Sequence, residues 1–164
     1  MTSSRKEERA RGIRLERPGT VSLLLTHLLL DFNGTLALDG ELLPGVAERI
    51  LGISALLSVT VLTSDTFGTA AERLAGLPVE VRIVRSGWDK KEFVASLSGG
   101  GIVAIGNGRN DIDMLRNADL GIAVMGGEGL AMELVQVAAL VVARVEDALD
   151  VLLSPRRLTA TLRS

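Results

Sequence analysis

The chain has 164 residues, of which 47% are apolar and 23% are charged. This composition is typical of a folded domain of the commonest size and excludes a largely disordered chain. Cysteine is absent, which excludes disulfide bonds, thiolate metal sites and a cysteine nucleophile.

Charge is distributed unevenly along the chain. Residues 1–17 hold six basic and three acidic side chains, whereas the remainder holds twelve basic and seventeen acidic ones. The acidic residues are interleaved with the basic ones and no aromatic residue accompanies them. We therefore interpret residues 1–18 as a mobile basic leader that does not bind nucleic acid, and expect residues 19–164 to form a single domain.

Six short apolar runs lie between helical patterns. They are rich in leucine and β-branched residues and lack polar alternation, which is typical of strands buried on both faces of a parallel sheet. The runs are residues 23–32, 58–63, 79–84, 101–105, 120–125 and 138–143. The leucine-rich stretch at residues 21–30 is about half as long as a membrane span. We therefore expect a cytoplasmic protein without a membrane segment.

Helices are predicted between these strands. Two of them are predicted to be capped by Asp89 and Asn110, because each is followed by a carboxylate three residues later. The alternation predicts a doubly wound, Rossmann-like α/β fold, a three-layer sandwich with a mainly parallel sheet. In such a fold, functional loops gather at the carboxyl ends of the strands.

Four polar segments follow the predicted strands or open the predicted helices. They are residues 31–36, 62–65, 89–97 and 106–111. Together they supply a carboxylate, a hydroxyl, a lysine and an oxygen-rich loop, which are the groups needed for magnesium-assisted phosphoryl transfer. A carboxylate that ends a buried strand, as Asp31 does, also requires a nearby cation or hydrogen-bond donors.

In this order the four segments resemble the haloacid dehalogenase superfamily, from about residue 20 onward. They are most similar to the phosphorylation domain of P-type ATPases and to the small proteins often called soluble P-type ATPases. The matching motifs read Asp-x-x-Gly-Thr-Leu, Leu-Thr-x-Asp, Asp-Lys-x-x-x-Val-x-x-Leu and Gly-x-Gly-x-Asn-Asp. The spacing between them leaves no room for the nucleotide-binding domain of the transport ATPases. The resemblance therefore implies a capless domain with an open pocket.

The resemblance implies a nucleophile and a metal site. Asp31 is expected to attack phosphorus and become an aspartyl phosphate. Mg²⁺ is the expected cofactor, held by Asp31, the backbone carbonyl of Asn33, Asn107 and Asp111.

The resemblance also implies contacts with a phosphorylated substrate. Thr63 is expected to hydrogen-bond the transferring phosphoryl group and Lys90 to balance its charge, with Lys91 as the alternative lysine. Ser64 and Arg109 are further candidates for substrate binding, although Arg109 is equally interpretable as a solvated loop residue.

Two residues depart from the family pattern. Asn33 stands where phosphatases of the superfamily usually have an aspartate that protonates the leaving group and activates water. General acid–base help is worth roughly a hundred- to ten-thousand-fold, so slow hydrolysis is expected. Asn107 stands where relatives commonly have a magnesium-ligating aspartate, which predicts weaker metal binding. The alternative function is a catalytically weak or inactive regulatory or interaction module, and in either case a homo-oligomer is expected.

Overall fold

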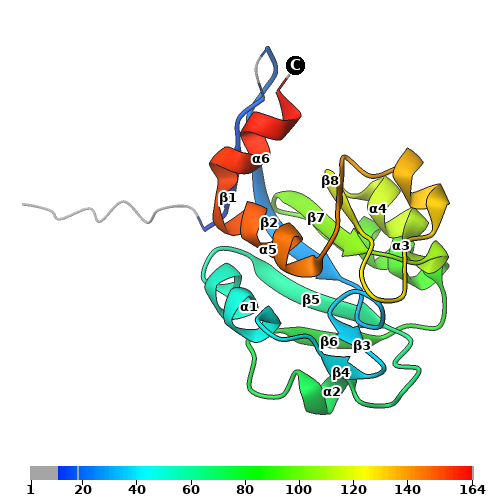
Figure 1. Ribbon diagram of the computed structural model, residues 1–164. Helices are drawn as coiled ribbons and strands as arrows, with labels where there is room; N and C mark the ends of the chain where they lie inside the picture. The colour runs from blue at the N-terminus through cyan, green and yellow to red at the C-terminus, as the bar shows by residue number, and fades with distance from the viewer. Residues whose placement is uncertain (1–10, 18, 164) are drawn as a thin grey trace, which may run out of the picture.

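The computed structural model describes residues 11–17 and 19–163. A main sheet is covered by helices on both sides (Figure 1). In chain order the elements are β1 (Ile13–Leu15), β2 (Leu23–Leu30), β3 (Ala37–Leu38), β4 (Glu41–Leu42), α1 (Val46–Ser54), β5 (Ser58–Thr63), α2 (Ala70–Arg73), β6 (Glu80–Ile83), α3 (Gly87–Ser96), β7 (Gly101–Gly106), η1 (Arg109–Asp111), α4 (Ile112–Asn117), β8 (Leu120–Val124), η2 (Met132–Gln136), β9 (Leu140–Val142), α5 (Val145–Leu153) and α6 (Pro155–Leu162).

The main sheet contains all six predicted strands, paired in parallel in the order β6-β5-β2-β7-β8-β9. Strand β2 lies in the middle, where Leu30 pairs with Val61 of β5 and Ile105 of β7. The prediction of strands buried on both faces is wrong for β6 and β9, which are partly or largely exposed. Both are edge strands, and an edge strand has a neighbour on one side only.

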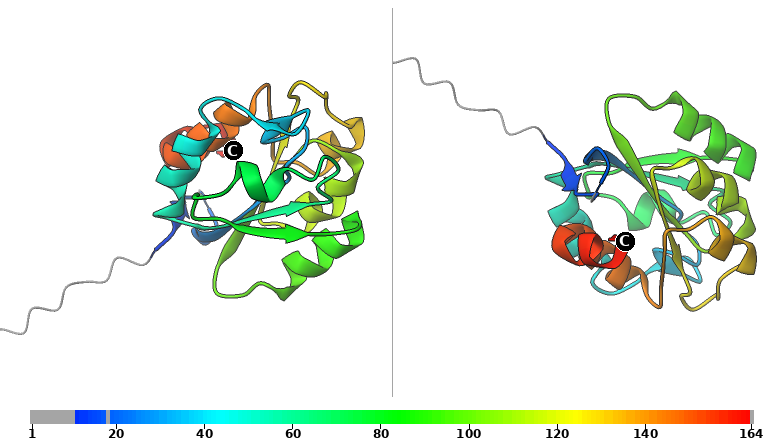
Figure 2. Two further views of the ribbon diagram at one scale, coloured as in Figure 1. Left: turned by 90° about the horizontal axis from the view of Figure 1, so that it is seen from below. Right: turned by 90° about the horizontal axis from the view of Figure 1, so that it is seen from above.

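Successive residues of the inner strands point into two different apolar cores. Leu28 and Leu30 belong to the core that packs under α1, α5 and α6. Leu29, between them, belongs to the smaller core under α3 and α4. Figure 2 shows the two groups of helices on opposite faces of the sheet. The predicted three-layer, doubly wound architecture is therefore confirmed.

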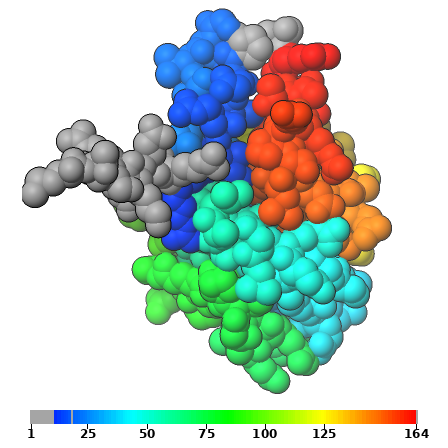
Figure 3. Space-filling view, turned by 90° about the vertical axis from the view of Figure 1, so that its left-hand side faces the viewer, coloured from blue at the N-terminus to red at the C-terminus, as the bar shows by residue number. Residues whose placement is uncertain are grey.

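The segment before β2 differs from the prediction. Strand β1 pairs antiparallel with Leu23–Leu25 of β2, and the side chains of Ile13 and Leu15 are 3% and 1% exposed. The C-terminal helices pack beside this segment, as Figure 3 shows in orange and red next to blue. The predicted boundary at residue 18 is thus wrong for residues 11–17, because two alternating apolar side chains complete the core. Residues 1–10 and 18 of the predicted leader lie outside the described residues.

Helix α3 begins earlier than predicted. The Ser86 hydroxyl accepts a hydrogen bond from the Asp89 backbone N–H at 3.4 Å, and the Asp89 carboxylate accepts one from the Arg85 N–H at 2.7 Å. Ser86 is therefore the cap and Asp89 the third helical residue, whose carboxylate bonds the N–H of the residue before the cap. This start places Lys90 on the face of α3 that packs against the sheet.

Helix α4 also starts differently from the prediction. Asn110 lies inside the short helix η1, and Asp111 is the residue that precedes α4. Within the described residues, no helix is both long enough and apolar enough to cross a membrane.

Candidate active site

The sheet topology brings Asp31 to the centre of the carboxyl edge. Its backbone N–H donates to the carbonyl of Ile105 at 3.0 Å, which continues the β2–β7 ladder by one residue. Thr63 ends the neighbouring strand β5, and Asn107 follows the other neighbour, β7. Segments far apart in the sequence therefore converge on Asp31, as the parallel-sheet prediction requires.

Lys90 lies between two buried carboxylates. Its Nζ donates to Oδ1 of Asp31 at 2.7 Å and to Oδ1 of Asp111 at 2.6 Å. Asp31 is 5% exposed, and Lys90 and Asp111 are 0% exposed. Two carboxylates thus share one ammonium group, and the formal net charge of the three buried side chains is −1. Lys91, the alternative lysine, lies 4.7 Å from the centre of the Trp88 ring and does not enter this cluster.

Burial and the neighbouring Asp111 raise the pKa of Asp31 to about 6, against the lowering effect of Lys90 and Thr35. Burial opposes the charge on Lys90, but attraction to Asp31 and Asp111 outweighs it, and the pKa of Lys90 is raised. Near neutral pH the lysine is therefore charged, and it holds both carboxylates in place.

The shifted pKa of Asp31 predicts a pH-dependent loss of stability. The folded protein holds this proton more tightly than the unfolded chain, so the stability contributed by Asp31 is fully present below pH 3.8 and is lost as pH rises through about 6. Without divalent cations, wild type should lose about 2 kcal/mol relative to Asp31→Asn between pH 4.5 and 7. Urea unfolding at both values measures this difference. Asp39→Asn, an exposed nearby change, should follow wild type, and parallel pH profiles for wild type and Asp31→Asn would contradict the interpretation.

Thr35 bridges Asp31 and Asn107. The turn after β2 is tight, because the Phe32 carbonyl accepts from the N–H groups of residues 35, 36 and 37. It returns the Thr35 hydroxyl to Oδ2 of Asp31 and Oδ1 of Asn107, each at 3.2 Å. A hydroxyl has one proton, so it can donate to only one of these oxygens at a time. The other oxygen keeps a lone pair for a further partner.

Asp111 mainly organises the loop after β7. Its Oδ2 accepts from the backbone N–H groups of Asn107 at 3.1 Å and Gly108 at 3.0 Å, while its Oδ1 accepts from Lys90. Both oxygens of this predicted metal ligand are therefore already engaged. The geometry supports a role in positioning Lys90 and Asn107.

Asn33 lies on the turn next to Asp31. Both polar atoms of its side chain are buried and have no hydrogen-bond partner. An orphaned amide of this kind is costly, and its place beside the candidate nucleophile indicates a position where a substrate or water would complete its hydrogen bonds.

Of the predicted phosphate-binding residues, Thr63 and Lys90 are buried, whereas Ser64 and Arg109 are exposed. Thr63 is fully buried, and its hydroxyl accepts from the Asp65 N–H at 2.9 Å, which leaves its proton for another acceptor. Ser64 is exposed and shares a hydrogen bond with Thr66. Arg109 is also exposed and pairs with Glu133 at 2.8 Å. The structure therefore brings Thr63 and Lys90 to the end of β2 but does not bring Arg109 into the cluster.

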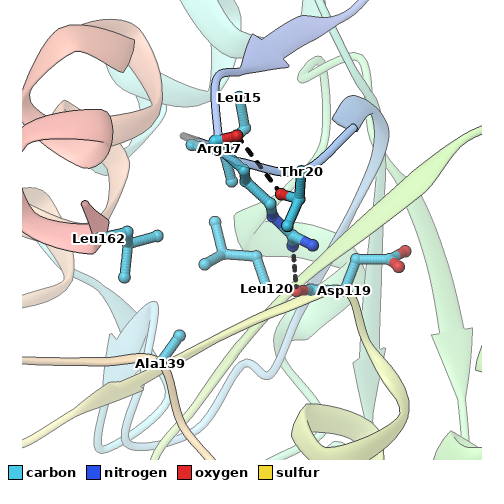
Figure 4. A pocket seen from close by; sticks show the side chains of 7 residues that line it. All are labelled: Leu15, Arg17, Thr20, Asp119, Leu120, Ala139 and Leu162. Carbon is cyan, nitrogen blue, oxygen red and sulfur yellow. Dashed lines mark hydrogen bonds between the residues drawn. The ribbon is translucent and has the colours of Figure 1, made fainter. Parts of the chain in front are cut away.

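The site is more closed than predicted. The carboxylate of Asp31 is nearly covered, and the loop after β8 approaches the turn after β2, since a Cβ added at Gly126 would lie 2.9 Å from the Gly34 carbonyl. The expectation of an open pocket is therefore not met at Asp31, although a hollow of about 320 Å³ lies at the same edge of the sheet, lined by residues that include Leu38, Gly126 and Val145. A hollow of about 320 Å³ lies at the opposite, amino edge of the sheet and contains none of the predicted site residues (Figure 4).

A search against family models matches residues 70–148 to the haloacid dehalogenase-like hydrolase model. The chain belongs to the haloacid dehalogenase-like hydrolase family. Within the described residues the segments between the sheet strands hold only short helices and the β3–β4 hairpin, and no cap domain is inserted. An uncharacterized protein of Methanocaldococcus jannaschii is 52% identical over 62 residues, which cover 38% of this chain and 67% of that protein.

Solved structures share the same fold. A zinc-transporting PIB-type ATPase is 26% identical with a TM-score of 0.61, over 73% of this chain but only 20% of the transporter. A 3-deoxy-D-manno-octulosonate 8-phosphate phosphatase from Moraxella catarrhalis, in complex with magnesium, phosphate and sugar, is 12% identical. Its TM-score is 0.67, over 83% of this chain and 90% of that one. A protein of the haloacid dehalogenase hydrolase family from Streptomyces avermitilis is 18% identical with a TM-score of 0.62. The match covers 84% of this chain and 87% of that one.

Two residues near the site were absent from the predicted set. Thr35 follows Asp31 by four positions, so a single tight turn suffices to return its hydroxyl to the carboxylate. Glu128 lies in the glycine-rich loop after β8, and its Oε2 would be 2.6 Å from a Cβ added at Gly34. Its position after a predicted strand, at the carboxyl edge, was the signal that could have identified it.

Proposed function

We propose that this protein is a phosphohydrolase or phosphotransferase that acts through an aspartyl phosphate on Asp31. The observation that carries this proposal is the buried contact between Asp31, Lys90 and Asp111 at the carboxyl edge of the sheet. This contact supports the proposal, because the proposed nucleophile lies beside a fixed cation that would neutralise an incoming phosphoryl group.

Three features of the site fit a divalent cation, which we propose to be Mg²⁺. The buried group carries a net negative charge, the Thr35 hydroxyl cannot satisfy both of its acceptors, and the Asn33 side chain has no partner. Within the described residues, no three His, Asp or Glu side chains are grouped to hold a metal. The ligands would therefore be carboxylate and neutral oxygens, from Asp31, the Asn33 carbonyl and Asn107, with Asp111 behind them. Such oxygen ligands suit Mg²⁺, which when bound would neutralise charge on the phosphoryl oxygens.

The proposed reaction has two steps. In the first, an oxygen of Asp31 forms a bond to phosphorus while the bond from phosphorus to the leaving oxygen breaks, and the leaving group keeps the electron pair. Thr63 and Lys90 donate hydrogen bonds to the transferring group. In the second, water attacks phosphorus and releases inorganic phosphate, which regenerates the Asp31 carboxylate.

Asn33 is expected to make both steps slow. A carboxamide cannot exchange a proton at neutral pH, so the leaving group must take its proton from solvent and the attacking water must lose one without a base. The phosphoenzyme should therefore be long-lived, and transfer to an acceptor other than water is as consistent with the site as hydrolysis.

A trapping experiment tests the proposal. Incubation of the full chain with acetyl phosphate and Mg²⁺ should leave an acid-stable, hydroxylamine-sensitive phosphoryl group on Asp31, located by mass spectrometry. Asp31→Asn should take up none, whereas Asp39→Asn should be labelled like wild type. An unlabelled wild-type protein would overturn the catalytic proposal and favour a regulatory or interaction module of the same fold.

We also propose that the protein acts in the cytoplasm on a phosphorylated substrate, and that it forms a homo-oligomer. Support for self-association comes from apolar side chains on loops and helix starts at the carboxyl edge, where Phe67, Trp88 and Met125 are 51%, 59% and 52% exposed. Light scattering at micromolar concentration should show a dimer or a larger species, and a monomer would contradict this part of the proposal.

A further inference from the structure

Glu128 lies where the site lacks a charged ligand. We infer that its carboxylate supplies the negative oxygen toward a divalent cation that Asn107, being neutral, does not. This inference rests on the proposed function, because it concerns the same metal site, and it deepens it by assigning a role to a residue of the loop after β8.

The inference rests on two side chains, Glu128 and Asn107, that lie next to Gly34. A Cβ added to Gly34 would lie 2.6 Å from Oε2 of Glu128 and 2.9 Å from Oδ1 of Asn107. The Glu128 carboxylate and the Asn107 amide therefore both lie where a side chain of residue 34 would be, immediately after Asn33. Gly34 has φ 78°, and the absence of a side chain at this position leaves room for both groups.

The loop that carries Glu128 is held in place at both ends. The N–H groups of Met125 and Gly126 donate to the carbonyls of Val142 and Ala143. Beyond Glu128, the Gly129 carbonyl accepts from Nδ2 of Asn107 at 3.0 Å. The side chain of Asn107 is thus bonded directly to the loop that carries Glu128, so their relative position follows from the backbone.

Glu128 is also free to bind a cation. It takes part in none of the ion pairs or side-chain hydrogen bonds found among residues 11–17 and 19–163. Its charge, added to the net −1 of Asp31, Asp111 and Lys90, would give −2 around the site, which balances a divalent cation. Hard cations are bound more tightly as the number of charged oxygen ligands rises.

Metal affinity tests this role without relying on turnover. Titration calorimetry with Mg²⁺, and with Mn²⁺ followed by electron paramagnetic resonance, should show a ten- to hundredfold loss of affinity in Glu128→Gln and Glu128→Ala, the range typical for groups that support a metal site. Glu92→Gln, an exposed carboxylate on α3, is the matched control and should bind as wild type does. Because Glu128 is exposed, the unfolding midpoint of its variants should not change.

A second substitution tests the functional link with Asn107. Asn107→Asp in the Glu128→Gln background should restore affinity, and should raise it more there than in wild type, because the two carboxylates would serve the same cation. If Glu128→Gln binds both metals as wild type does, the inference is overturned while the proposed function stands. Loss of affinity without an Asp31 adduct would overturn the proposed function and retain the role of Glu128. If wild type binds neither metal, the inference is overturned together with the proposed metal site.

Discussion

Replacement of Lys90 by methionine is expected to destabilise the protein by about 3 to 5 kcal/mol at pH 7.5, the range seen when one partner of a buried ion pair is removed. The lysine side chain is completely buried and bonds both Asp31 and Asp111. Methionine has a similar shape but no charge, so the two carboxylates would face each other without a cation. Urea unfolding followed by circular dichroism measures the loss.

Lys91→Met is the matched control for this experiment. Lys91 is the next residue on α3 and lies over the Trp88 ring outside the cluster, so its replacement should cost under about 1 kcal/mol. The loss in Lys90→Met should shrink toward pH 5, where protonation relieves the repulsion between the carboxylates. Equal effects of the two substitutions would show that the buried lysine does not hold the site together.

Asn33→Asp is expected to raise phosphatase turnover on a small activated phosphoester by about ten-fold or more. The substitution supplies the proton-transfer group that the site lacks, and each factor of ten corresponds to about 1.4 kcal/mol of activation free energy. The Asn33 side chain lies on the turn next to Asp31, and its two polar atoms have no other partner. A carboxylate there would therefore break no hydrogen bond.

The double variant Asp31→Asn/Asn33→Asp separates true catalysis from background hydrolysis. It should be inactive, because the new acid cannot act without the nucleophile. The single variant should also show a shorter-lived adduct with acetyl phosphate than wild type, since the same group would activate water in the second step. A longer-lived adduct, or no gain in turnover, would show that Asn33 is not the residue that limits the reaction.

Most of the sheet was predictable from the residues that form it. Inner strands such as β2 and β7 are continuous apolar runs, and a run buried on both faces has few alternatives to a parallel strand. The run that contains β6 alternates apolar and charged residues, Val-Glu-Val-Arg-Ile-Val, which was a signal of an exposed strand, whereas the run of β9 is apolar and its exposure depends on which neighbours the fold places beside it. Strand β1 was missed because Ile13 and Leu15 lie in a basic segment, and their alternation matters only once β2 is beside them.

The candidate nucleophile and its lysine were also predictable. Asp31 ends an apolar strand, and the cost of burying a carboxylate required a cation nearby. The choice between Lys90 and Lys91 depended on where α3 begins, and the cap at Ser86 settled it by setting which side chain faces the sheet. Arg109 could not be placed from sequence, because its pairing with Glu133 links η1 to η2, two short helices that pack only in the tertiary structure.

The sequence by itself determined the order of the strands in the chain, the position of Asp31 at a strand end and the absence of a proton-transfer group at Asn33, since these are properties of residue type and local pattern. The tertiary structure decided which groups act together. In the folded chain both carboxylate oxygens of Asp111 accept hydrogen bonds. Thr35 lies between Asp31 and Asn107, and Glu128 lies beside Asn107 next to Gly34. The physical reason is that glycine-rich loops have no periodicity from which their path can be predicted. Their conformation is set by long-range hydrogen bonds, which form only when the sheet has brought the loops together.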